Sequence, residues 1–242
     1  EIKTKDININ DYVYVKRAGD VIPDIDRVEL KKRHKIKSII PPKKCPSCSS
    51  NLKQINNQIA LKCINSKKCR PQIEGSIIHF ISRKGMNIIG IGNQIIKELI
   101  EKKLINRTSD IYSLNEKDFK KLERVGAKSI ENYMSAIEKS KKVIFSKFIY
   151  SLGIKEVGES SSKSLANEFN RIEDLVDCSL DKLVMIDDVG PIVAENIISY
   201  MDDKDNKKNI YDLIKFGINI IYLKSIKNSK SVVITGSFEN YS

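Results

Sequence analysis

Residues 122–130, LERVGAKSI, place a hydrophobic-glycine pair between two segments of helical periodicity. The same kind of pair recurs at intervals of 34, 32 and 32 residues, as Ile91-Gly92, Val125-Gly126, Val157-Gly158 and Val189-Gly190. An internal repeat of about this length indicates an array of small helical units. We therefore expect residues 76–226 to form a helical domain in which four short turns each open a new helix.

The helix after each glycine is predicted to bury one face. Counted from the glycine, apolar residues recur near +4, +7, +8 and +11, seen in the second and fourth copies as Ile130, Met134, Ile137, Ala194, Ile197, Ile198 and Met201. These spacings lie on one side of an α-helix. An offset of 64 residues aligns the second copy with the fourth, and two extra residues in the first loop let Phe80-Ile81 and Gly85 match Phe148-Ile149 and Gly153. The repeat unit is therefore predicted to be a pair of motifs.

Several residue types used in catalysis have simpler explanations here. The 64-residue offset sets Cys178 opposite Leu114, which predicts a small buried hydrophobic residue. His34 and His79 lie at no useful spacing from a cysteine, carboxylate or serine motif, and residues 160–162, SSS, open a helix, where capping is the usual role. We predict no catalytic residue in this segment.

A glycine at a helix start is suited to hold a phosphate group. Backbone N–H groups point outward at the positive end of the helix dipole, and the missing side chain permits close approach. Such loops contact the nucleic-acid backbone rather than base edges, which predicts binding to duplex DNA without sequence preference. A single glycine of this kind is more often a plain helix terminator, but four copies favour the phosphate interpretation.

The charge of the chain agrees with a polyanionic partner. Lys and Arg total 43 against 31 Asp and Glu, a formal net charge of +12, although a biased composition gives the same excess. Asp187 and Asp188 precede Gly190, whereas Arg124 and Lys128 flank Gly126, so the second turn is expected to bind phosphate better than the fourth. The predicted DNA-contacting residues are Lys16, Arg17, Gly90, Gly92, Gly126, Lys128, Gly158 and Gly190.

Four of the five cysteines have the spacing of a metal site. Cys45-x2-Cys48 is followed after fourteen residues by Cys63-x5-Cys69, in a polar segment behind Pro41-Pro42 and rich in lysine. Four thiolates suit one tetrahedral zinc ion, and with all four positions filled the site is structural rather than catalytic. Paired disulfides are the weaker interpretation, since the pattern is not that of a secreted protein.

The remaining segments set the organisation of the chain. Residues 11–30 alternate polar and apolar positions around a turn at Gly19-Asp20, which predicts a β-hairpin. No apolar run is long enough to span a membrane and no signal segment opens the chain, so a soluble cytoplasmic protein is expected. The sequence lacks an initiating Met and stops within a strand and turn, which we interpret as a fragment.

Together these motifs resemble the bacterial NAD-dependent DNA ligases along almost the whole chain. Residues 16–23, KRAGDVIP, look like the family's signature near the end of its oligonucleotide-binding (OB) fold, and the cysteine spacing matches its zinc finger. Similarity to the family's helix-hairpin-helix motifs is carried by residues 79–83 (HFISR), 122–126 (LERVG) with Lys128-Ser129, 148–154 (FIYSLGI), 157–159 (VGE) and 188–190 (DVG). Residues 232–238, VVITGSF, resemble the first strand and turn of a BRCT domain.

The resemblance implies a multidomain, mainly α fold. It divides into the C-terminal part of an OB-fold at residues 1–42, a four-cysteine zinc finger at 43–75, four tandem helix-hairpin-helix motifs at 76–226, and the start of an α/β BRCT domain at 227–242. One structural zinc is implied at Cys45, Cys48, Cys63 and Cys69.

The resemblance also implies an activity for the full-length enzyme. A lysine takes AMP from NAD and passes it to the 5′-phosphate at a nick in duplex DNA, and the 3′-hydroxyl then displaces AMP with magnesium assisting. That lysine lies in a Lys-x-Asp-Gly motif, which this sequence lacks, so NAD and magnesium are expected to bind outside this segment, which alone does not ligate. The implied partner is nicked double-stranded DNA in replication and repair, bound without sequence preference by a monomer in the bacterial cytoplasm, at the nucleoid.

Two other classes of function remain open from the residues. Paired helix-hairpin-helix motifs also occur in non-catalytic DNA-binding subunits and in the tails of excision-repair nucleases, and an upstream Lys-x-Asp-Gly motif or a carboxylate-rich nuclease domain would discriminate between them and a ligase. The other class is a zinc-ribbon interaction protein without a nucleic-acid role, and such a protein would give no gel shift with DNA.

Overall fold

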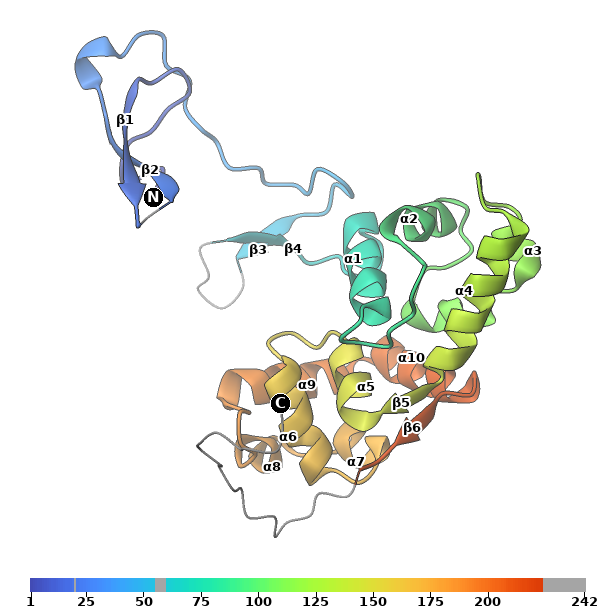
Figure 1. Ribbon diagram of the computed structural model, residues 1–242. Helices are drawn as coiled ribbons and strands as arrows, with labels where there is room; N and C mark the ends of the chain where they lie inside the picture. Colours follow the sequence, from blue (N-terminus) through green and yellow to red (C-terminus); the bar gives the residue numbers. More distant parts are fainter. Residues whose placement is uncertain (20, 55–59, 224–242) are drawn as a thin grey trace, which may run out of the picture. The chain divides into compact units, whose positions relative to one another are not determined.

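The computed structural model describes residues 1–19, 21–54 and 60–223 (Figure 1). By its internal contacts the chain divides into two compact units, Glu1–Asn65 and Ser66–Ser242. The residues expected to begin a BRCT domain, 227–242, lie outside the described part of the chain.

The first unit contains the predicted β-hairpin. β1 (Val13–Ala18) pairs antiparallel with β2 (Ile22–Val28), and the 3-10 helix η1 (Leu30–Lys32) follows. Arg33 fastens the chain after this hairpin, because its guanidinium donates to the carboxylate of Asp11, whose side chain is only 1% exposed, and to that of Asp6. The antiparallel pairing of β1 with β2 on either side of Gly19 confirms the predicted hairpin.

A second, shorter hairpin carries part of the cysteine pattern. β3 (Leu52–Gln54) pairs antiparallel with β4 (Leu61–Cys63), so Leu52 stands opposite Cys63. A bridge between Lys44 and Asn51 holds the preceding segment against this hairpin. Two isolated short strands are marginal in water without further support.

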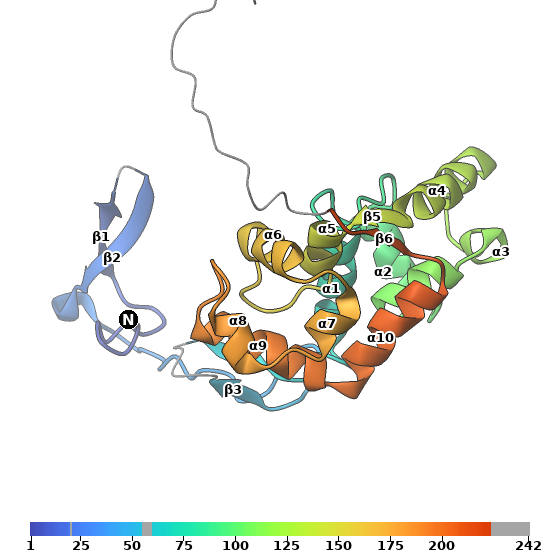
Figure 2. The same cartoon turned by 90° about the horizontal axis from the view of Figure 1, so that it is seen from below.

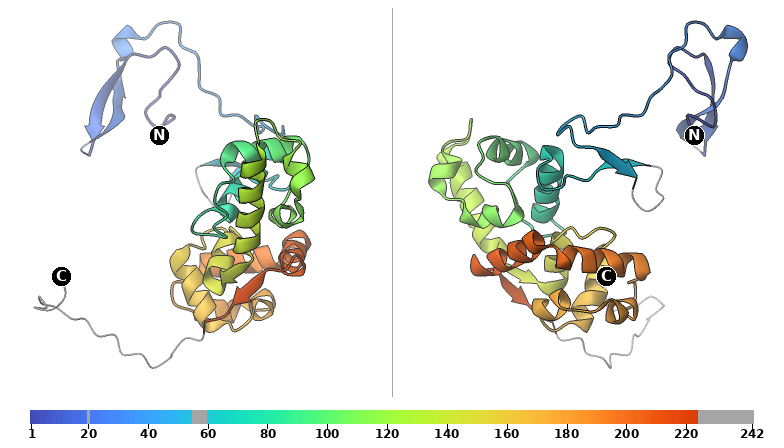
Figure 3. Two further views of the ribbon diagram at one scale, coloured as in Figure 1. Left: turned by 45° about the vertical axis from the view of Figure 1, so that its right-hand side comes forward. Right: turned by 180° about the vertical axis from the view of Figure 1, so that it is seen from behind.

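The second unit is helical, as the periodicity predicted. Its helices, in chain order, are α1 (Arg70–Ile81), α2 (Asn93–Glu101), η2 (Thr108–Ser113), α3 (Glu116–Phe119), α4 (Ala127–Ser140), α5 (Phe145–Ser151), α6 (Glu159–Glu168), α7 (Ile172–Val176), α8 (Leu180–Val184), α9 (Pro191–Asp202) and α10 (Lys204–Lys215). Figures 2 and 3 show how these helices are arranged. They surround one apolar core, in which Phe80, Phe119, Phe145 and Phe148 are fully buried.

Two features of this unit were not foreseen from the sequence. β5 (Lys142–Ile144) and β6 (Asn219–Ile221) form a parallel pair that joins the middle of the unit to the segment after its last helix (Figure 2). The helix α1 begins at Arg70, so the expected boundary between residues 75 and 76 falls within a helix.

The predicted 64-residue repeat is visible in the helices. Asn115 and Ser179 stand at equivalent positions and each caps the helix that follows, α3 in one copy and α8 in the other. Phe119 and Leu183 are both fully buried at the next equivalent position. Cys178 departs from the pattern, since it is half-buried whereas its counterpart Leu114 is 6% exposed. The prediction of a buried Cys178 is thus only partly right.

The first and third copies also correspond, with a correction to their alignment. Gly153 has a φ of +68° and lies five residues before the N-cap glycine Gly158, and the residue with a positive φ five residues before Gly92 is Asn87 rather than Gly85. Gly85 has a different role, because a Cβ there would lie 2.6 Å from the Phe80 carbonyl oxygen. The two extra residues of the first loop therefore precede Asn87.

None of the helices in the described part of the chain combines the length and apolar character needed to cross a membrane.

Candidate nucleic-acid interface and metal centre

The four predicted hydrophobic-glycine turns share one backbone geometry. Each glycine is the N-cap of the next helix, with φ between −73° and −92°, and so Gly92, Gly126, Gly158 and Gly190 precede α2, α4, α6 and α9. Two residues before each glycine the backbone is left-handed, with φ between 58° and 99°, at Gly90, Arg124, Glu156 and Asp188. The turns are therefore four copies of one structure.

Internal packing does not explain the glycine at the N-cap. A Cβ added at any of the four would meet no atom within 4 Å, and their negative φ suits any residue. All four glycines are exposed, while the apolar residue before each is buried or half-buried. A glycine that terminates a helix has a left-handed backbone, so that alternative does not describe these positions. The open space in front of each glycine is what the close approach of a phosphate requires.

The helices that follow these turns also lack side-chain caps. Among the residues that the structure describes, no side-chain cap accepts a hydrogen bond from the start of α2, α4, α6 or α9. By contrast, Asn115, Ser179 and Asp203 cap α3, α8 and α10. First-turn N–H groups of these helices are thus available to an external acceptor such as water or a phosphate oxygen, except at Pro191 of α9, which has no N–H, and at Ser129 of α4, which donates to the Gly126 carbonyl at 3.0 Å.

Side-chain contacts join the turns in pairs. The Glu98 carboxylate, on α2, accepts a hydrogen bond from the backbone N–H of Glu123 in the second turn at 2.7 Å. On α6, the Ser160 hydroxyl donates to the Asp188 carboxylate at 2.6 Å and the Ser161 hydroxyl to the Asp188 carbonyl at 3.0 Å. The first turn's helix thus contacts the second turn, and the third turn's helix contacts the fourth. Ser160 and Ser161 therefore form this contact and do not cap α6. The expectation that residues 160–162 act as helix caps is corrected accordingly.

Charge distinguishes the four turns. The second turn carries Arg124, and Lys128 is 81% exposed in the first turn of α4, where it pairs with exposed Glu131 at 3.2 Å. Residues 85–96, which include the first turn, hold no charged side chain. At the third turn, a hydrogen bond from Lys84 lowers the pKa of Glu159. The fourth turn has Asp187 and Asp188, so attraction for an anion decreases from the second turn to the fourth.

Lys16 and Arg17, predicted to contact DNA, lie on β1. Lys16 pairs with Asp26 at 3.1 Å, while Arg17 is exposed opposite Pro23. Consecutive residues of a strand point to opposite faces. Lys16 and Arg17 therefore lie on opposite faces of the hairpin, and a duplex lying against one face would contact only one of them.

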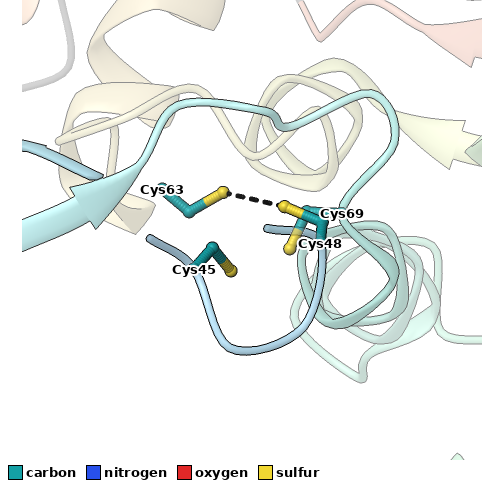
Figure 4. Close-up of side chains that lie close together, drawn as sticks. All are labelled: Cys45, Cys48, Cys63 and Cys69. Carbon is teal, nitrogen blue, oxygen red and sulfur yellow. Dashed lines mark hydrogen bonds between the residues drawn. The ribbon is translucent and has the colours of Figure 1, made fainter. Parts of the chain in front are cut away.

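The four cysteines of the predicted metal site come together. Their sulfur atoms all lie within 4.8 Å of one another, and the Sγ atoms of Cys48 and Cys63 are 3.5 Å apart (Figure 4). Around a tetrahedral zinc with Zn–S distances of about 2.3 Å, sulfur atoms stand about 3.8 Å apart. Cys45 and Cys69 are buried and the other two are half-buried. The donor set, its spacing and its burial therefore fit zinc.

Local structure favours the thiolate form at this cluster. Hydrogen bonds from the side chain and backbone of Ser50 lower the pKa of the Cys48 thiol to about 6. Cys69 is the N-cap residue of α1, where the helix dipole stabilises negative charge. Metal ligation by cysteine requires this deprotonated form.

His79 has a structural role. Its Nε2 lies 2.7 Å from the carbonyl oxygen of Tyr150, and the two rings are 4.7 Å apart between centroids. The imidazole thereby joins α1 to α5. No sequence motif indicated this contact, because its two residues lie far apart in the chain.

Two sequence profiles match parts of the chain. One, the NAD-dependent DNA ligase OB-fold domain, matches residues 1–37, which contain the first hairpin. The other, the helix-hairpin-helix motif, matches residues 147–210, which contain the third and fourth turns.

Proteins similar over the whole chain carry the name DNA ligase. Those of Francisella tularensis subsp. novicida and Francisella philomiragia subsp. philomiragia are each 39% identical over 249 aligned residues, and that of Francisella tularensis subsp. tularensis is 38% identical. The alignments cover 100% of this chain but 37% of each relative. The chain thus spans little more than a third of the length of these relatives.

Proposed function

Because the chain is homologous along its whole length to DNA ligases, with a first segment of the NAD-dependent type, we propose that it is the part of such a ligase that grips the DNA. The complete enzyme seals single-strand nicks by joining a 3′-hydroxyl to a 5′-phosphate through an AMP intermediate. NAD and magnesium act in a part of the enzyme outside these residues. Similarity to proteins named DNA ligase over all 242 residues favours a ligase over an excision-repair nuclease.

We assign the chain to the four segments expected from its sequence. Residues 1–42 end an OB-fold, 43–75 form a four-cysteine zinc finger, 76–226 hold four helix-hairpin-helix motifs, and 227–242 begin a BRCT domain. The profile for the hairpin motif covers only the third and fourth turns. The first and second turns are assigned to the same motif because their glycine N-caps and left-handed residues repeat the same geometry.

One observation carries the DNA-binding proposal. Four exposed glycines stand before uncapped helices, with open space where a side chain would be, and neither backbone conformation nor internal packing requires glycine there. Such helix starts bind phosphate through N–H groups. Contacts of this kind position the protein on a duplex and read no bases. The proposed partner is therefore nicked double-stranded DNA, without sequence preference.

Zinc is proposed as a structural ion bound by Cys45, Cys48, Cys63 and Cys69. The sulfur spacing described above supports it, and a full set of four protein ligands leaves no position for a substrate. The ion would be held by thiolates alone and would have a structural rather than a catalytic role. We further propose that the protein acts as a monomer in the bacterial cytoplasm, at the nucleoid.

A binding experiment tests this function. The 242-residue chain, saturated with zinc, is titrated into fluorescein-labelled nicked duplexes of two unrelated sequences, and anisotropy is recorded. We expect saturable binding with equal affinity for both sequences. Absence of binding at low salt would instead favour the zinc-ribbon interaction protein without a nucleic-acid role.

A further inference from the structure

A second basic feature lies beside the first turn and belongs to none of the four glycines. A pocket of about 510 Å³ opens in the helical unit between the loop of residues 85–89, the C-terminal half of α4 and the strand β5. Ile89, which lines it, directly precedes Gly90 of the first turn and is 64% exposed. The pocket is therefore continuous with the surface on which that turn lies.

One wall of the pocket is a polar stripe of α4. Asn132, Ser135, Ala136 and Lys139 line it, and their spacing of three, one and three residues places them on the same face of the helix. The opposite, buried face of α4 contributes Ile130 and Ile137 to the core. The stripe is thus a second, polar face whose amide, hydroxyl and ammonium groups border one cavity.

Three lysines line the pocket, namely Lys139, Lys142 and Lys147. All three are exposed, and none of them forms an ion pair with an acidic group of the described residues. The neighbouring Lys141, by contrast, pairs with Glu138 at 2.7 Å. No Asp or Glu of the described residues lines the pocket. Three cations around one cavity repel one another, and an anion bound among them relieves that repulsion.

The walls around these lysines are held in place by buried contacts. The N–H of Met86 donates to the carbonyl of Phe80 at 2.8 Å, and Gly85 packs too closely on α1 for any side chain. At the other end, the hydroxyls of Ser140 and Tyr112 share a buried hydrogen bond of 2.9 Å. The pocket is thus preformed, which lowers the conformational cost of binding.

We propose that this pocket binds a backbone phosphate of the same duplex that the first turn contacts. The inference rests on the proposed DNA-binding function and adds a contact site outside the four turns. Lys139, Lys142 and Lys147 supply charge, and Asn132 and Ser135 supply hydrogen-bond donors. Its position next to Ile89 and Gly90 places it along the path of a strand held at that turn.

The test is a triple variant, Lys139→Gln, Lys142→Gln and Lys147→Gln, in the zinc-loaded 242-residue chain. Duplex affinity is measured by anisotropy at several salt concentrations. Because each neutralised phosphate contributes about 0.9 to the slope of log affinity against log salt, loss of the one phosphate contact should make the slope shallower by about 1, and affinity at about 0.1 M salt should fall more than about tenfold.

A matched control removes the same charge elsewhere. Lys204, Lys208 and Lys215 lie exposed on α10, outside the pocket and the turns, and form no ion pair with a described acidic residue. Their replacement by Gln should change affinity by less than about threefold, since only the long-range field is altered. Zinc content and circular dichroism should match those of the unaltered chain in both variants.

Three outcomes are decisive. Equal effects of the two triple variants, while Gly126→Val still weakens binding, would overturn the pocket and leave the function of the turns intact. If inorganic pyrophosphate binds the unaltered chain and the pocket variant loses it without losing DNA, the site serves a free anion and the duplex proposal is wrong. If the unaltered chain binds no DNA, the proposed function is wrong, and the pocket proposal, which rests on it, is wrong as well.

Discussion

At the scale of single residues, Gly126 and Gly190 occupy the same place in two turns whose charges differ. Replacing Gly126 by Val should weaken DNA binding by about tenfold at about 0.1 M salt, because a branched side chain would keep one phosphate from the N–H groups. The same change at Gly190 should cost less than about threefold, since Asp187 and Asp188 already repel an anion there. Anisotropy titrations with one labelled duplex measure both.

These two variants control for each other. A Cβ meets no neighbouring atom within 4 Å at either site, and Val suits the negative φ of an N-cap, so the loss of helix stability should be about 1 kcal/mol or less in both. Thermal unfolding should therefore give similar midpoints. Equal losses of affinity from the two replacements would show that the glycines only mark the starts of helices.

Cys178 should react slowly with thiol reagents at neutral pH. Burial raises the pKa of its thiol, so a smaller fraction is thiolate at neutral pH and the reaction should accelerate as the pH rises. In the zinc-loaded chain, labelling should be at least about threefold slower than that of an unstructured cysteine peptide. A rate equal to that of the peptide would contradict this.

The sequence predicted single residues well where a repeat defined them. All four glycines take the expected place at a helix start, and the apolar positions counted from them, such as Ile130 and Ala194, are buried. The half-burial of Cys178 escaped prediction because the segment before it is an α-helix, whereas its counterpart Leu114 follows a 3-10 helix. The same offset in sequence therefore does not give the same packing.

At the scale of elements, the cysteine cluster should decide whether the hairpin β3–β4 is folded. Elemental analysis of freshly purified, reduced protein should find one zinc per chain, and Cys45→Ser should lose it. Removing the metal with a chelator should unfold the hairpin, because structural zinc contributes roughly 10–16 kcal/mol in small fingers. The helical unit should keep its circular dichroism, since its core rests on Phe80, Phe119 and their neighbours.

Cys178→Ser is the matched control for this experiment. It removes a thiol that lies outside the cluster, and zinc content should remain at one per chain. Finding no metal in protein that has four reduced cysteines in the cluster would contradict the assignment.

Elements with local signals were predictable, and elements without them were not. The hairpin at β1–β2 is indicated by alternation around Gly19, and each turn helix by its periodicity. The parallel pair β5–β6 joins two three-residue strands far apart in the chain, so no window of sequence contains its signal. Lys139, Lys142 and Lys147 lie close together in the sequence but on a helix, a strand and another helix, so the sequence alone does not show that they line one pocket with residues 85–89.

At the scale of the whole molecule, binding should be strongly dependent on salt and nearly independent of sequence. If roughly six phosphates are neutralised, the slope of log affinity against log salt should be about −5, since each contact releases about 0.9 counterion. Titrations at several salt concentrations with two unrelated duplexes provide the measurement. A flat dependence would be incompatible with a phosphate grip.

The hydrogen bonds that join the turns in pairs have a mechanical consequence. Asp188 is held by the hydroxyls of Ser160 and Ser161, and Glu98 holds the backbone of Glu123, so the partners of each pair cannot drift apart independently. The distance between the two turns of a pair is therefore fixed by the protein. If both turns of a pair hold phosphates, as proposed, a duplex whose phosphates are spaced differently would have to deform in order to bind. Affinity would then depend on the shape and deformability of the duplex without any contact to a base.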